Sequence, residues 1–151
     1  MPYKTPRPRP QGEPDDLLHR AAEQQQRELV GRLAIPSGPE GIATLVRAFA
    51  DSRTSRLRCY ILDALRTSED PRVTGLVEAG LADGSPSTRC HAIEALLLRR
   101  PAPPDACRLL LPLLRDPGVV PRCRATEAAA GLGCRSPEAV AELLRCSAHA
   151  D

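Results

Sequence analysis

The chain has 151 residues, of which 42% are hydrophobic and only 2% aromatic, and its formal net charge is +2. This length fits one domain that buries its own core. Because aromatic and β-branched residues are scarce, the composition argues against a β-sandwich and favours closely packed helices rich in Leu and Ala. The net charge is too small to indicate a class of partner.

The N-terminal stretch MPYKTPRPRP contains no apolar run, so we expect no secretory signal. No segment approaches the ~20 apolar residues of a membrane span. We therefore expect a cytoplasmic protein that does not bind membranes and whose six cysteines are reduced thiols rather than a disulfide framework. Residues 1–13 are predicted to be a disordered tail rich in Pro and Arg.

Three landmarks recur in the same order along the rest of the chain. The prolines are spaced 32, 33 and 33 residues apart, at Pro39, Pro71, Pro104 and Pro137. An aspartate follows twelve residues after each of the first three prolines, at Asp51, Asp83 and Asp116. An Arg-Cys pair comes six or seven residues later, beginning at Arg58, Arg89 and Arg122. A period of this size is typical of stacked helical units.

Each unit is predicted to be a hairpin of two helices. Asp70 and Ser136 stand directly before prolines and are suited to cap the first helix of their units. In the third unit this first helix carries its apolar residues at helical spacing, at Cys107, Leu110, Leu111 and Leu114. The second helix begins just before Arg-Cys, and the third, sixth and seventh residues after the arginine form its apolar face. Most of these residues are small, which allows close approach of helices.

The predicted boundaries define one domain over residues 14–151. A capping helix at 14–35 precedes repeats at 39–70, 71–103 and 104–136, and a second capping helix occupies 137–148. We expect the apolar face of the first capping helix to be formed by Leu17, Leu18, Ala21, Leu29, Val30 and Leu33. A stack of this kind needs caps because a single hairpin cannot cover its own apolar face.

This pattern resembles HEAT repeats of the short, phycobilisome-lyase-type variety. The resemblance rests on the turn aspartates, on the arginines early in the second helices, and on the segments ILDAL and IEALL, and it covers residues 39–148. It implies an all-α fold, a short right-handed α-solenoid whose second helices line the concave side, and in most members a binding surface. The chain departs from the family by the Cys after each arginine and by Gly131-Leu132-Gly133 at the end of the third unit.

The cysteines of the three Arg-Cys pairs fall on neighbouring second helices. Helix axes pack roughly 8–10 Å apart, whereas a disulfide needs Cα atoms within about 7 Å, so we expect no ladder of disulfides. We interpret Cys59, Cys90 and Cys123 as small half-buried residues, and whether they have a redox or ligand role stays open. Cys107 aligns with Ile42 and Val140 and is predicted to belong to the core. No metal site is predicted.

An acid stands four residues after each of these cysteines, on the same side of the second helix. Beside each acid lies the residue two positions after the arginine. The predicted partner-binding residues are therefore Tyr60, Asp63, His91, Glu94, Arg124 and Glu127. On the concave side they would form a groove for a basic or amphipathic segment of another protein. The alternative is a solvated face whose acids pair with nearby arginines such as Arg66 and Arg99.

We expect a non-enzymatic interaction or adaptor module without catalytic residues or a cofactor. One alternative is a DNA-binding HEAT-like protein of the alkylpurine-glycosylase type, with a basic patch formed by Arg47, Arg53, Arg56 and Arg58. The acidic stripe and the absence of Trp argue against nucleic acid. Another alternative is an accessory subunit of a lyase-like enzyme, which would need a ligand pocket. An apolar edge at a terminal helix would also allow a homodimer.

Overall fold

The computed structural model describes residues 24–32, 38–99 and 101–147. Within these ranges the chain is all-α and contains no strand. The predicted tail at 1–13 and the parts of the first capping helix at 14–23 and 33–35 lie outside the described residues. A helical segment at 24–32 is followed, in chain order, by α2 (Gly38–Asp51), α3 (Ser55–Leu65), α4 (Pro71–Leu81), α5 (Pro86–Leu98), α6 (Ala106–Leu110), the 3-10 helix η1 (Leu111–Arg115), α7 (Val119–Gly131) and α8 (Pro137–Ser147). None of the described helices is long and apolar enough to cross a membrane.

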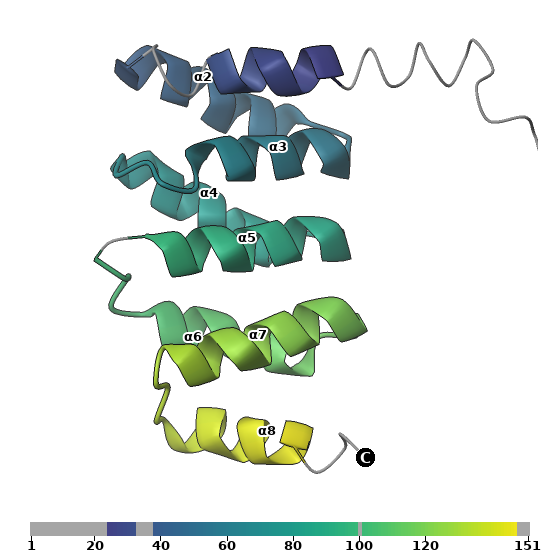
Figure 1. Cartoon of the computed structure of the whole chain (residues 1–151), viewed down its shortest axis with the longest axis vertical. Coiled ribbons are helices and arrows are strands. Elements are labelled where there is room, and N and C mark those ends of the chain that lie inside the picture. The colour runs from purple at the N-terminus through teal and green to yellow at the C-terminus, as the bar shows by residue number, and fades with distance from the viewer. Residues whose placement is uncertain (1–23, 33–37, 100, 148–151) are drawn as a thin grey trace, which may run out of the picture.

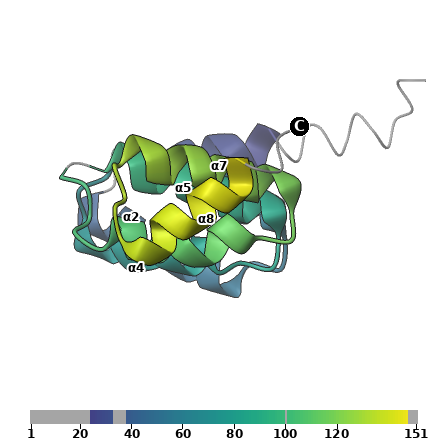
Figure 2. The same cartoon turned by 90° about the horizontal axis from the view of Figure 1, so that it is seen from below.

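The helices stack in chain order in two rows (Figure 1). One row contains α3, α5 and α7, and the other contains α2, α4 and the short α6 with η1. Seen along the stack, the two rows lie side by side, and α8 covers the end of the molecule (Figure 2). Each helix therefore packs against its hairpin partner in the other row and against the next helix of its own row. Helix α8 contacts both η1 and α7.

Local signals fix where these helices begin. Asp70 accepts a hydrogen bond from the backbone N–H of Arg72 at 2.9 Å, and Pro71 is the first residue of α4. Ser136 Oγ accepts one from the backbone N–H of Ala139 at 3.2 Å, at the start of α8. Both N-caps predicted from the sequence are thus confirmed, because each side chain satisfies a backbone N–H that has no partner within the helix.

The core lies between the two rows and consists almost entirely of aliphatic side chains. Eight of the nine predicted inward residues of the second helices are buried, namely Ile61, Leu65, Ala92, Ala95, Leu96, Ala125, Ala128 and Ala129. The ninth, Ala64, is half-buried. Packing is closest at Gly80 of α4, where an added Cβ would lie 2.9 Å from the Ala92 Cβ and 3.3 Å from Leu62 Cδ1. Glycine at this position allows α4 to approach α3 and α5.

Two elements differ from the prediction. The first helix of the third unit is α-helical only over Ala106–Leu110 and continues as the 3-10 helix η1. Pro112 explains the change, because it has no N–H to donate to the preceding turn. In the helical segment 24–32, Val30 is buried as expected, but Leu29 is 56% exposed. Leu29 therefore does not belong to the buried face of this segment.

Candidate partner-binding face

The repeated arginines join adjacent units at the end of the stack where the first helix turns into the second. Arg58 Nη1 donates to Asp83 Oδ2 at 2.5 Å, and its Nη2 donates to the carbonyl of Ser52. Arg89 forms two hydrogen bonds with Asp116, from Nε at 2.6 Å and from Nη2 at 2.8 Å. Arg58 and Arg89 thus each hold the turn aspartate of the following unit.

The Arg89–Asp116 pair is the most deeply buried of these contacts. The side chains are 11% and 3% exposed, respectively. Burial opposes ionisation of Asp116, but hydrogen bonds from Arg89 and from the backbone N–H of Gly118 outweigh it and lower the pKa of the carboxyl. The hydrogen bonds to Asp116 also raise the pKa of Arg89. The pair stays ionised and fixes α5 to the turn that precedes α7.

The predicted binding residues lie on α3, α5 and α7 and are half-buried or exposed. They contact one another across adjacent helices. His91 Nδ1 lies 2.7 Å from Asp63 Oδ1, and because an ionised carboxylate can only accept, the imidazole donates. Arg124 Nη1 lies 3.6 Å from Glu94 Oε1. Each contact joins the acid of one second helix to the basic residue of the next.

This arrangement changes the expected acidic stripe. Asp63 and Glu94 each contact a basic residue of the next second helix, whereas Glu127 is exposed and forms no ion pair within residues 101–147 or with the other described ranges. Helical spacing predicts that these residues share one face but does not predict their pairing across helices. The signal was present, since His91 and Arg124 are basic and occupy the same position in successive units.

Tyr60, the remaining residue of the predicted set, lines a cleft of about 260 Å³ between the helical segment 24–32 and α3. The guanidinium groups of Arg27 and Arg66 stand at this cleft together with Asp63, and the apolar lining residues are Val30, Gly31 and Ala64. The cleft thus combines two cations, one acid and a small apolar surface. The cleft lies at the α3 end of the row of predicted binding residues, whereas Glu127 lies at the α7 end.

The three cysteines that follow the repeated arginines differ in burial. Cys59 is buried, and its sulfur lies 3.8 Å from Ser87 Oγ and 3.9 Å from Thr88 Oγ1 of α5. Cys90 is half-buried, and burial raises the pKa of its thiol. Cys123 is exposed. All three are free thiols, so the ladder of disulfides that helix spacing disfavoured does not form.

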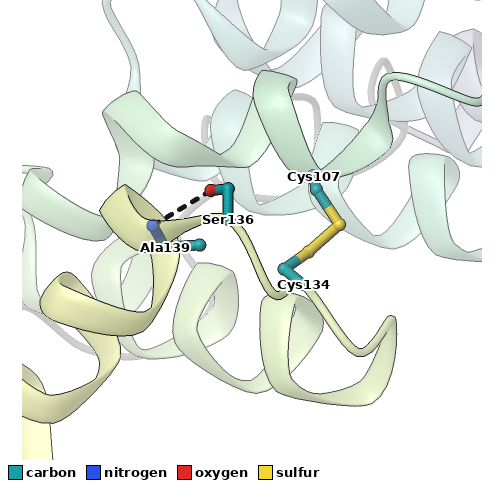
Figure 3. The surroundings of a disulfide bond; sticks show 4 residues. All are labelled: Cys107, Cys134, Ser136 and Ala139. Carbon is teal, nitrogen blue, oxygen red and sulfur yellow. Dashed lines mark hydrogen bonds between the residues drawn. A yellow bond between two sulfur atoms is a disulfide. The ribbon is translucent and has the colours of Figure 1, made fainter.

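Two other cysteines contradict the expectation that all six are reduced. Cys107 on α6 and Cys134 after α7 form a disulfide, with Cα atoms 5.5 Å apart (Figure 3). Cys107 was predicted to be a core residue, and Cys134 had been given no role. The link depends on how α7 ends: Gly133 has φ 66°, its N–H donates to the Ala130 carbonyl, and the N–H of Cys134 donates to the Ala129 carbonyl. This Schellman motif turns the chain back toward α6.

A charged cluster attaches α8 to the third unit. The buried Glu142 accepts hydrogen bonds from Arg115 of η1 and from Arg145 of its own helix, the latter at 2.9 and 2.7 Å. The hydrogen bonds from Arg115 and Arg145 lower the pKa of Glu142 to about 2. Since Glu142 would be costly to bury alone, these arginines determine how α8 docks.

In the part of the chain that the structure describes, no group of three or more His, Cys, Asp or Glu side chains is arranged to hold a metal ion. Comparison with known proteins gives no match, because no family model, no curated protein and no solved structure matches the chain. The function must therefore be argued from the residues themselves.

Proposed function

We propose that this protein is a non-enzymatic interaction module, a short right-handed α-solenoid of HEAT-like hairpins. It binds a segment of another protein along α3, α5 and α7, which line the concave side in this proposal. The partner-binding face consists of Tyr60, Asp63, His91, Glu94, Arg124 and Glu127. The proposal places the protein in the cytoplasm, where a module of this kind would act as an adaptor or scaffold.

The observation that carries the proposal is the series of charged contacts between second helices. Asp63–His91 and Glu94–Arg124 hold half-exposed polar side chains in fixed positions across three helices. Neither pair is needed to neutralise a buried charge, and exposed pairs of this kind contribute only about 0–1 kcal/mol to stability. A partner segment that meets side chains already held in place loses less conformational entropy on binding.

The chemistry of the face indicates the kind of segment that it accepts. The exposed Glu127 at one end favours a basic residue, and the apolar lining of the cleft at Tyr60 favours an apolar side chain. An amphipathic segment that runs across α3, α5 and α7 would supply both. Asp63 and Glu94 already contact basic residues of the protein. A purely basic segment would therefore gain less binding energy from this face than its three acids suggest.

The test compares two variants that change the net charge equally. The first neutralises the acids of the face through Asp63→Asn, Glu94→Gln and Glu127→Gln. The control neutralises three exposed acids elsewhere, through Glu69→Gln, Glu78→Gln and Glu138→Gln. Affinity purification from the source organism, quantified by mass spectrometry, should recover the same partner with the wild type and the control but not with the first variant.

Circular dichroism and thermal melting establish that both variants fold, since exposed charge changes of this kind alter stability by about 0.5 kcal/mol or less. Binding of the purified partner is then measured directly at two salt concentrations. A partner that binds all three proteins with equal affinity would remove α3, α5 and α7 as the binding face.

A further inference from the structure

The contacts between consecutive units form two series that are present in the first two units and have no counterpart in the third among the described residues. In the first series, Arg58 holds Asp83 and Arg89 holds Asp116. Arg122 is the next arginine. It donates to the carbonyl of Asp116 in its own turn at 2.6 Å but forms no ion pair among the described residues. Among the described residues, no aspartate of a following turn pairs with Arg122.

The acids of the second helices repeat this pattern. Asp63 is paired with His91, and Glu94 is paired with Arg124, each on the following second helix. Glu127 is exposed, as noted above, and α8 is a first helix without a second helix after it in the described part of the chain. The cysteines follow the same order, because Cys59 is buried against α5 whereas Cys123 is exposed.

The first helices give independent evidence at the same end of the stack. The sixth residue after each proline is Leu45, Val77 or Leu110 in the three units, and these side chains are 1%, 1% and 0% exposed. The equivalent residue of α8, Leu143, is only half-buried. Nearby on α8, Val140 is 41% and Leu144 is 65% exposed. A second helix following α8 would cover this apolar surface.

We propose that the C-terminal face, formed by Arg122, Cys123, Glu127, Val140 and Leu143, docks one helix of another protein in the position that a second helix following α8 would take. This end-on surface shares Glu127 with the partner-binding face proposed above, but the inference does not depend on that proposal. Its polar groups are those that join consecutive units inside the protein, so the incoming helix must supply the complementary groups.

The chain's own second helices define the chemistry of that occupant. In α5 and α7, an acid stands three residues before the first residue of the helix, at Asp83 and Asp116. A basic residue follows eight residues after each acid, at His91 and Arg124. Ser87 and Thr88, which meet Cys59, are small and hydroxylated. We therefore expect a partner helix with an acid in the preceding turn, short side chains in its first turn, and a Lys, Arg or His eight residues after the acid.

A second copy of this chain fits the face less well. Helices α7 and α8 run in opposite directions (Figure 1). In a two-fold dimer with antiparallel α8 helices, the incoming α8 runs parallel to α7, as a following second helix would. It has Cys134 three residues before its start and Glu142 eight residues after that, so it supplies neither an acid for Arg122 nor a base for Glu127 at the spacing of the chain's own second helices. At the opposite end of the stack, the helical segment 24–32 already covers the first unit with the buried Val30.

The test uses a labelled peptide with the sequence of residues 82–98, Cys90 replaced by Ser, and a lactam staple to keep it helical. It contains Asp83 and His91 in the required spacing. Fluorescence polarisation should show saturable binding to the full-length protein. Arg122→Glu and Glu127→Arg should each weaken binding about ten-fold, since each places like charges opposite one another. The control Glu78→Arg, an exposed acid on α4, should change the affinity less than two-fold.

Charge exchange then identifies the contacts. The peptide with Asp83→Arg should bind the Arg122→Glu protein about as well as the original pair binds, and the peptide with His91→Glu should restore binding to Glu127→Arg. The proposal is overturned if Glu78→Arg weakens binding as much as Arg122→Glu, if the exchanged peptides restore nothing, or if no binding occurs. It is also overturned if sedimentation shows a dimer that Val140→Arg disrupts. Changing Asp63 and Glu94 should leave peptide binding intact, which separates this result from the partner-binding face.

Discussion

Removing the Cys107–Cys134 disulfide should destabilise the third unit by several kilocalories per mole. The link joins cysteines 27 residues apart. For a loop of this length, the chain-entropy relation gives a loss of about 12 cal/mol/K from the unfolded state, or about 3.5 kcal/mol at 298 K. Cys107 lies on the five-residue helix α6, which ends before Pro112 and continues as the 3-10 helix η1, so the local helix does little to hold Cys107 in place without the link.

Urea denaturation of the wild type with and without a dithiol reductant, and of the double variant Cys107→Ala with Cys134→Ala, measures this contribution. We expect the reduced protein and the double variant to lose about 3–4 kcal/mol of unfolding free energy relative to the oxidised protein. The exposed Cys123→Ala serves as the control and should lie within about 0.5 kcal/mol of the wild type. Peptide mapping without reduction should recover the two cysteines cross-linked. Equal stability of oxidised and reduced protein, or a map without this link, would refute the reasoning.

Three further predictions concern stability. Arg89→Ala should cost about 3–5 kcal/mol in urea denaturation, because the carboxylate of Asp116, 3% exposed, would stay buried without its partner; a loss below about 1 kcal/mol would contradict this. In α4, Gly75→Ala should stabilise the protein by about 0.5–1 kcal/mol, because its Cβ would meet nothing within 4 Å. Gly80→Ala should destabilise it, because its Cβ would lie 2.9 Å from a neighbouring carbon. Changes of the melting temperature in the same direction for both variants would be inconsistent with close packing at Gly80. The pKa of Glu142 is lowered from 4.5 to about 2, so its stabilising contribution is complete above about pH 4.5 and is lost as the pH falls through 2. The unfolding free energy of the wild type should therefore fall more steeply over this range than that of Glu142→Gln, and parallel curves would argue against the cluster.

The features that follow from helical periodicity could be predicted from the sequence. The landmarks repeat every 32 or 33 residues, and two of the repeated arginines, Arg58 and Arg89, contact the turn aspartates Asp83 and Asp116 of the units that follow them. The side chains of these ion pairs are largely buried, because the small residues on the inner face of the second helices bring those helices close together. The repeat landmarks determine these contacts because both partners lie at equivalent positions in consecutive units.

Contacts that depend on the offset between neighbouring helices could not be predicted in the same way. The pairs Asp63–His91 and Glu94–Arg124 join residues 28 and 30 positions apart. Which residues meet there depends on how far one helix is shifted along the next, and apolar spacing alone does not determine that shift. The acids could therefore be placed on one face, but their partners could not be named.

The disulfide was missed for a different reason. Alignment of the repeats made Cys107 equivalent to Ile42 and Val140, which hid a feature that only the third unit has. Two signals in the sequence were available: Pro112 inside a first helix and Gly133 after a second helix. The first shortens the α-helical part of α6 and the second reverses the chain toward it, so together they bring Cys134 to Cys107.

The arginine contacts also give the stack a direction. Each arginine reaches forward to a carboxylate in the unit that follows it, and the carboxylates are less exposed than the arginines, with values of 7% against 27% and 3% against 11%. A nascent polypeptide emerging from the ribosome with only its first units complete would end in an arginine that water can still reach. Such an intermediate would contain no buried turn aspartate that lacks its arginine partner. The chain can therefore fold progressively during translation, and each newly synthesised turn meets a cation that is already in place.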